Sequence, residues 1–335
     1  MRILVTGGCG YIGSHSIVEL IGEGFEVVII DNQSNSKKEV VQNISKVTSH
    51  SIIEYHNIDL RDINALRLAI GDIQFSCVIH FAALKSIPES FNNALEYYDN
   101  NICGTINLLR VMKEKTIENI IFSSSASIYG GDNVSPYKES YSLKANNPYA
   151  QTKIYIEKII SDTVNSGDIK KAINLRYFNP VGAHSSGLLG EDPLNVPTNI
   201  MPVICRVASK QQSKLKIFGG DYNTPDGTGV RDYIHIQDLA LGHVCALQKV
   251  LSDNNFLGVE NVNLGTGIGY SVLDLIHTFE KVNSVTVPYE ISNKREGDIA
   301  VAFADPSHAF KFLSWRSKQN LEDMCRDVWR WSNTK

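Results

Sequence analysis

The sequence predicts an α/β protein with a Rossmann-type, doubly wound parallel sheet and a smaller C-terminal α/β substrate lobe. Up to residue 178, short runs rich in β-branched residues alternate with longer helical stretches, which is the order of βαβ units. Some runs, such as 27–30, are continuously apolar, as expected of strands that helices cover on both faces. From 179 to 232 the alternation stops and Pro, Gly and Asn become frequent. We therefore predict a first domain over 1–178 and a second lobe over 179–335.

The individual elements follow from the positions of these runs. Strands are expected at 3–6, 26–31, 52–57, 77–81, 119–123 and 172–178. Helices are expected between them, at 12–23, 62–71, 97–114 and 150–166. The second lobe is predicted to contain a helix at 236–251, a strand at 261–264, further elements at 271–281 and 285–290, and a final amphipathic helix at 321–332. Within it, residues 232–266 are expected to pack back on the first domain.

The composition is that of an ordinary globular protein, with 43% hydrophobic and 20% charged residues. The net charge of -4 comes without a basic block, so we expect no nucleic-acid partner. No run approaches the roughly 20 apolar residues of a spanning helix, so we expect no membrane partner. The six cysteines form no CxxC pair and the nine histidines show no HxxxH or HExxH spacing. We therefore expect reduced thiols, a cytoplasmic location and no metal site.

A glycine-rich loop directly follows the first predicted strand. Gly7, Gly10 and Gly13 have the spacing G-x-x-G-x-x-G and precede a helix. Glycines at these positions permit a tight turn and close approach to a pyrophosphate at the helix N-terminus. Asp31 ends the second strand, where a carboxylate binds ribose hydroxyls and repels a 2′-phosphate. The combination predicts NAD rather than NADP, although the loop alone could be a glycine-rich turn without a ligand.

Three residues have the arrangement of a proton-transfer site. Ser125 lies at the end of the fifth strand, and Tyr149 and Lys153 lie one turn apart at the start of a helix. An ammonium beside the phenol would lower the pKa of Tyr149, which could then take a proton from a substrate hydroxyl while hydride leaves the carbon. Tyr-x-x-x-Lys is a weak pattern by itself. Its position behind the glycine loop, Asp31 and Ser125 favours the catalytic interpretation.

These residues belong to longer sequence blocks that span nearly the whole chain. Through them the chain resembles the extended short-chain dehydrogenase/reductases and, among these, the UDP-galactose 4-epimerases. The blocks are VTGGCGYIGSH (5–15), DNQSNS (31–36), HFAALKSIPES (80–90), EYYDNN (96–101), SSSASIYG (123–130), PYAQTK (148–153), LRYFNPVGAH (175–184), GTGVRDYIH (227–235) and REGD (295–298).

The resemblance implies an NAD-dependent interconversion of UDP-glucose and UDP-galactose, extending to their N-acetylated counterparts, through transient oxidation at C4. Besides the three glycines, it implies NAD contacts from Tyr11, Ile12, Asp31, Asn32, Gln33, Ser34, Asn35, Ser36, Asp59, Leu60, Phe81, Ala82, Ala83, Leu84, Lys85, Asn100, Ser123, Tyr149, Lys153 and Phe178. It implies UDP-hexose contacts from Ser125, Tyr149, Asn179, Asn199, Ile200, Lys216, Ile217, Phe218, Arg231, Arg295, Asp298 and Ala302. It also implies a homodimer formed through helices near 97–114 and 150–166.

Some alternatives remain open at this stage. Arg231 and Arg295 suit a diphosphate clamp but could equally form surface ion pairs. A nucleotide-sugar 4,6-dehydratase would share the loop and the Tyr/Lys pair, but Ala126 and Ser127 cannot supply the extra acid and base that elimination requires. A non-catalytic NAD-binding module would not require the full Ser/Tyr/Lys set. The departures from the family pattern are Cys9, Ala83 and Ala302, and only Ala302 bears on substrate range.

Overall fold

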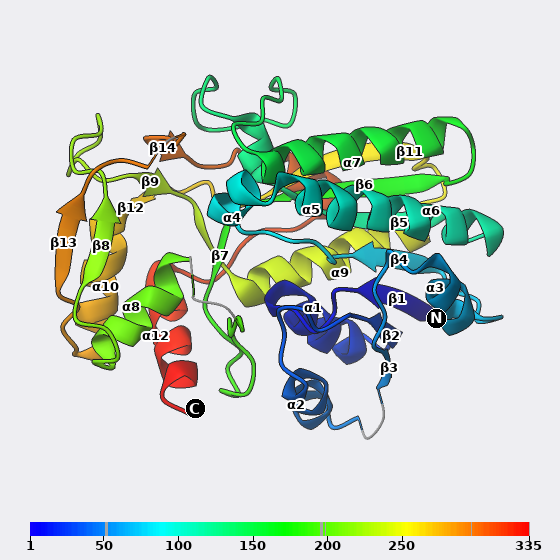
Figure 1. The fold of residues 1–335 in the computed structure, drawn as a ribbon, viewed down its shortest axis with the longest axis horizontal. Coiled ribbons are helices and arrows are strands. Elements are labelled where there is room, and N and C mark those ends of the chain that lie inside the picture. Colours follow the sequence, from blue (N-terminus) through cyan, green and yellow to red (C-terminus); the bar gives the residue numbers. More distant parts are fainter. Residues whose placement is uncertain (51–52, 195–196, 198, 296, 335) are drawn as a thin grey trace.

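The computed structural model describes residues 1–50, 53–194, 197, 199–295 and 297–334. Its central feature is a seven-stranded sheet in the order β11-β6-β5-β4-β1-β2-β3 (Figure 1). Each neighbouring pair in this sheet is parallel. The Rossmann-type, doubly wound class is therefore confirmed. The strands are β1 (Arg2–Thr6), β2 (Glu26–Ile30), β3 (Glu54–His56), β4 (Cys77–His80), β5 (Asn119–Ser125), β6 (Lys171–Tyr177) and β11 (Gly258–Leu264).

Helices cover both faces of the sheet, which is why β1, β2 and β4 are almost entirely buried. Alternate residues of β1 enter different cores: Ile3 and Val5 pack on one face and Leu4 on the other. The first face is covered by α1 (Tyr11–Gly22), α2 (Glu39–Thr48) and α9 (Ile236–Ser252). The second face is covered by α3 (Ile63–Ile70), α6 (Gly104–Glu114) and α7 (Pro148–Asn165).

The helix predicted over 97–114 is interrupted. After α4 (Ile87–Asn92) and α5 (Ala94–Tyr98), a π-helical turn, η1 (Asp99–Cys103), precedes α6. The side-chain amide of Asn101 in this turn accepts a hydrogen bond from Leu84 N at 2.8 Å and donates one to Leu84 O at 3.1 Å. Such turns recur at functional sites because they redirect side chains. Here the turn fixes the loop that follows β4.

The smaller lobe lies at one end of the sheet and has its own core (Figure 1). Met201, Leu275 and Val328 belong to this core. The lobe contains α8 (Ile200–Ala208), β8 (Leu215–Phe218), α10 (Val272–Asn283), β13 (Tyr289–Ser292) and α12 (Leu321–Ser332). The remaining elements are η2 (Ala126–Tyr129), β7 (Asn179–Val181), β9 (Val230–Arg231), β10 (Tyr233–His235), β12 (Tyr270–Ser271), β14 (Val301–Ala302) and α11 (Ser307–Leu313).

Residues beyond 178 contribute to both parts of the molecule. The strand β11 pairs with β6 in the large sheet, and α9 packs against α1. Ala309 and Trp315 also enter the core on that face. The domain boundaries themselves stay a prediction. Residue 52 of the predicted third strand lies outside the described residues, and across the described residues no helix is long and apolar enough to cross a bilayer.

Candidate active site

A cavity of about 1200 Å³ opens along the carboxyl ends of the strands β1, β2, β4 and β5. In a parallel sheet this edge gathers the loops that follow each strand, and ligands bind there. The glycine loop lines one part of the cavity, Asp31 another, and Tyr149 with Lys153 a third. The topology therefore joins motifs that are more than a hundred residues apart in the chain.

The glycine loop is closed to side chains at two positions. A Cβ atom on Gly7 would lie 2.5 Å from Ala82 N, and Gly7 has a φ of +72°. A Cβ atom on Gly13 would lie 2.4 Å from Gly7 O. Because real Cβ contacts are never this short, both positions require glycine. The helix α1 begins directly behind, with Gly10 as its N-cap, so the loop fits a pyrophosphate.

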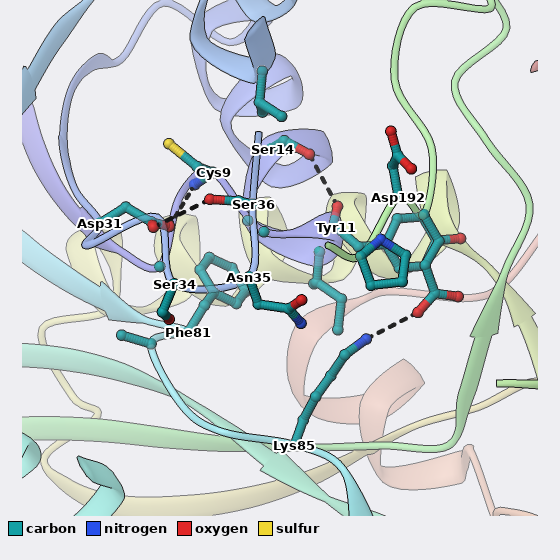
Figure 2. Close-up of a pocket in the computed structure, with 18 of the residues that line it drawn as sticks. Cys9, Tyr11, Ser14, Asp31, Ser34, Asn35, Ser36, Phe81, Lys85 and Asp192 are labelled. Atoms are coloured by element: carbon teal, nitrogen blue, oxygen red, sulfur yellow. Dashed lines mark hydrogen bonds and ion pairs between the residues drawn. The ribbon is translucent and has the colours of Figure 1, made fainter. Parts of the chain in front are cut away.

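Asp31 lies at the adenosine end predicted for the cofactor. Its carboxylate accepts a hydrogen bond from Cys9 N at 2.9 Å (Figure 2) and another from Gln33 N at 2.7 Å. Burial raises the pKa of this carboxyl, and the two backbone donors oppose the rise. A buried carboxylate with further acceptor capacity fits the ribose hydroxyls of a dinucleotide. The loop and Asp31 thus both fit NAD.

Tyr149 and Lys153 line the other end of the cavity, which we call the catalytic end, and Ser125, which is outside the lining, contacts Tyr149 there. Tyr149 is in the first turn of α7, which Asn147 caps by accepting a hydrogen bond from Ala150 N. Burial raises the pKa of Tyr149, and a hydrogen bond with Ser125 lowers it. The expected lowering by the Lys153 ammonium is not among these causes, because Lys153 Nζ donates instead to Ser123 O at 2.6 Å.

Lys153 is fully buried, and burial lowers its pKa to about 7. Its Nζ lies 4.7 Å from the centre of the Phe122 ring and 5.8 Å from that of Tyr149. Glu157, one turn further along α7, raises the pKa of Lys153. Glu157 is itself held by a buried bidentate ion pair with Arg176, at 2.7 and 3.0 Å. The charge of the catalytic lysine therefore depends on a neighbour that sequence reasoning missed.

Most of the predicted cofactor residues line this cavity. Gln33 and Phe178 are not in the lining, and Phe178 packs with Tyr137 beside the site instead. The predicted residues that do line it are Gly7, Gly10, Tyr11, Ile12, Gly13, Asp31, Asn32, Ser34, Asn35, Ser36, Asp59, Leu60, Phe81, Ala82, Ala83, Leu84, Lys85, Asn100, Ser123, Tyr149 and Lys153.

Several of the predicted sugar-nucleotide residues form a separate group in the smaller lobe, which we call the distal cluster. It consists of Phe218, Arg231, Arg295 and Asp298. The Arg295 guanidinium lies 3.8 Å from the centre of the Phe218 ring. Arg231 donates to Asp298 at 2.8 Å. Both predicted arginines are thus close together, and Arg231 holds a carboxylate in the position where a diphosphate is expected.

The other predicted substrate residues differ in their location and in how exposed their side chains are. Asn179 is exposed on β7, and Asn199 caps α8 and lines the cavity. Ile200 is the half-buried first residue of α8. On β8 the side chains of Lys216 and Ile217 face opposite ways, with Lys216 exposed and Ile217 in the core of the lobe. The side chain of Ile217 is therefore buried in the lobe, and its contact with the UDP-hexose stays a prediction.

Sequence reasoning also missed one whole side of the cavity. Residues 187–193, Tyr177, Trp331 and Thr334 all line it. Tyr177 ends β6 directly before the predicted Phe178, so its place at the sheet edge could have been inferred. The segment 187–193 is irregular and follows no strand of the large sheet, so no periodic signal identifies it.

Comparisons with known proteins agree with this arrangement. Residues 4–328 match the family model described as GDP-mannose 4,6 dehydratase. The chain is 47% identical to the UDP-glucose 4-epimerase of Dictyostelium discoideum, over 99% of this chain and 96% of that protein.

Two solved structures are similar over the full chain. A UDP-glucose 4-epimerase from Stenotrophomonas maltophila, with bound NAD and formylated UDP-arabinopyranose, is 46% identical with a TM-score of 0.95, covering 100% of this chain and 98% of that one. The UDP-glucose 4-epimerase from Bifidobacterium longum, in complex with NAD+ and UDP, is 41% identical with a TM-score of 0.95 and the same coverage.

Proposed function

This chain belongs to the UDP-glucose 4-epimerase family, and we propose that it interconverts UDP-glucose and UDP-galactose by inverting C4 of the hexose. It is an NAD-dependent isomerase. The observation that carries the proposal is that Lys153 and Tyr149, with Ser125 hydrogen-bonded to Tyr149, lie at one end of a cavity whose other end fits a dinucleotide. The family model is described by a dehydratase, but Ala126 and Ser127 leave this chain without the extra acid and base of an elimination.

The chain's own residues divide the chemistry between proton transfer and positioning. Bound NAD would supply the hydride acceptor and donor that inversion at C4 requires. Tyr149 takes the proton of the C4 hydroxyl and gives it back after inversion. Ser125 bridges the sugar oxygen and the phenol, which keeps them in line. Lys153, held by Ser123 O, supplies positive charge where the phenolate develops.

The test of this function is an assay without added cofactor. An epimerase returns its hydride, so purified protein should convert UDP-galactose to UDP-glucose with NAD retained and no NADH accumulating. Release of one NADH per oxidised sugar would instead identify a dehydrogenase. A 4-keto-6-deoxy product would identify a dehydratase.

We also propose that the protein works as a homodimer. Adjacent helices on one side of the large domain expose apolar side chains: Phe91 is 54% exposed, Leu95 85% and Tyr155 47%. They lie on α4, α5 and α7, which contact one another. A second copy of this surface, related by a two-fold axis, would cover them. Analytical ultracentrifugation should give the mass of a dimer for the wild type and of a monomer for Leu95→Asp. A monomeric wild type would contradict the proposal.

A cytoplasmic location and a wider substrate range complete the proposal. The six cysteines are free thiols, which is consistent with a reducing compartment.

Ala302 pairs in register with Arg231 and packs beside Phe178 and Tyr137. This position lies between the distal cluster and the catalytic end, so a small side chain there leaves room for a 2-acetamido group on the sugar.

A further inference from the structure

One stretch of the chain that follows β7 forms a wall of the cofactor cavity. We call residues 187–194 the crossing segment, and its residues 187–193 line the cavity. Figure 2 shows Lys85 extending across the cavity toward this segment, on which Asp192 is labelled. Lys85 itself comes from the loop after β4, in the first half of the sheet. The cavity therefore has one wall from each part of the molecule.

Glu191 makes the main link between these walls. Its Oε1 atom accepts from Lys85 Nζ at 2.9 Å and from Asn199 Nδ2 at 2.6 Å. The Glu191 side chain is only 8% exposed, whereas Lys85 is 47% exposed. Lys85 and Asn199 both line the cavity. One buried carboxylate oxygen thus holds a residue of the cofactor loop and the capping residue of α8, the first helix of the smaller lobe.

Two further polar contacts of the crossing segment lie nearer the surface. Asp192 pairs with Lys37 at 2.6 Å, and these side chains are 29% and 44% exposed. Leu194 N donates to Asn35 at 3.1 Å, in an exposed position. Exposed pairs contribute little because water competes for both partners. Glu191 is therefore the contact whose loss should matter most.

We propose that Glu191 is a positioning residue that fixes Lys85 over the cofactor and Asn199 at the substrate side, so that retention of NAD depends on it. The inference rests on the proposed function, in which NAD stays bound through every turnover. A lysine has a flexible four-carbon stem, and a charged partner selects one of its conformations before the ligand arrives. Because Glu191 Oε1 also accepts a hydrogen bond from Asn199, loss of this carboxylate would also weaken binding of the UDP-sugar.

The experiment measures NAD release from purified holoprotein in the absence of sugar. Each variant is passed through gel filtration, and the NAD remaining is followed over time by absorbance and enzymatic cycling. Glu191→Ala should release NAD at least about tenfold faster than wild type, and Glu191→Gln should fall between them. Asp192→Asn should change release less than threefold. Glu114→Gln, in an exposed ion pair on α6, is the matched control and should leave release unchanged.

A double-mutant cycle separates positioning from general support of the fold. If Glu191 acts through Lys85, then Glu191→Gln should add little to the faster release that Lys85→Met already causes. With NAD saturating, Glu191→Gln should also raise KM for UDP-glucose more than it lowers kcat. Unchanged release in Glu191→Ala, or additive effects of Glu191→Gln and Lys85→Met, would overturn the proposal. Because release is measured without sugar, a failure here is distinct from an absence of epimerase activity.

Discussion

The catalytic end and the distal cluster hold their charged groups in opposite ways. At the catalytic end, Lys153 is 2% exposed and its pKa is lowered to about 7 by burial. In the distal cluster, the Arg231 and Asp298 side chains are 20% and 30% exposed and neutralise one another at 2.8 Å. The catalytic end thus holds the Lys153 ammonium where burial disfavours its charge. The distal cluster holds the Arg231–Asp298 ion pair where water partly screens it.

This difference indicates how each region should act. A buried charge interacts strongly with charge that develops nearby, so the catalytic end should control the chemical step and its pH dependence. A partly exposed pair can exchange its internal partner for a ligand at small net gain. The distal cluster should therefore control substrate affinity. Substitutions in the two regions should change kcat and KM in different proportions.

The largest effect is expected from Tyr149→Phe at the catalytic end. The change removes the oxygen that takes the proton while keeping the ring, so kcat should fall by roughly 10²–10⁴ with KM within a few-fold of wild type. Steady-state kinetics on UDP-galactose measure both. Tyr289→Phe, the same change at an exposed position of β13, is the control. Near-normal turnover in Tyr149→Phe would show that another group is the base.

Lys153→Met should reveal the cost of the buried charge as a pH-dependent difference in stability. The folded-state pKa of about 7 lies below the ordinary value of 10.5. Protonated Lys153 therefore opposes folding below pH 7, and this cost decreases as pH rises from 7 toward 10.5. Relative to wild type, the variant should be more stable by on the order of a few kcal/mol at pH 6, less the lost hydrogen bond to Ser123 O.

The measurement is the free energy of unfolding of both proteins between pH 6 and 9. The advantage of Lys153→Met should shrink steadily as pH rises. Lys158→Met, at an exposed position on the same helix, should give a difference that changes little with pH. A constant difference between the Lys153 variant and wild type would mean that burial does not lower the pKa of Lys153, which then keeps its proton in the folded state across this pH range.

Some parts of the candidate site could be predicted from the sequence and others could not. The glycine loop, Asp31 and the Tyr149/Lys153 pair follow local rules of turn geometry and helix spacing, and the structure brings them to one cavity. By contrast, the partnership of Glu157 with Arg176 joins a helix to a strand 19 residues later. The crossing segment has no periodicity at all. Contacts of this kind depend on tertiary packing, which spacing along the chain does not encode.

Substitutions of Ala302 measure how much room the sugar has between the catalytic end and the distal cluster. Ala302→Tyr should lower kcat/KM for UDP-N-acetylglucosamine by roughly 10–100-fold, because overpacking costs about 1–3 kcal/mol and the acetamido group sweeps the larger volume when the sugar turns. The value for UDP-glucose should change by only a few-fold. Ala302→Ser, which keeps the position small, serves as the control. No wild-type activity on the N-acetylated sugar, or equal losses on both sugars, would contradict this role of Ala302.

The smallest effect is expected from Arg231→Lys in the distal cluster, and it should appear in KM alone. Lysine keeps the charge but loses the planar fork that can bind two diphosphate oxygens together. The diphosphate does not change during epimerisation, so its contacts stabilise the bound substrate and the transition state equally. The net loss is limited to about 1 kcal/mol because the diphosphate must compete with Asp298 for the same guanidinium. KM for UDP-glucose should rise about fivefold with kcat unchanged, while Arg326→Lys in an exposed pair on α12 leaves both constants as they are. A fall in kcat matching the rise in KM would place Arg231 with the catalytic end, and the division between the two regions would not hold.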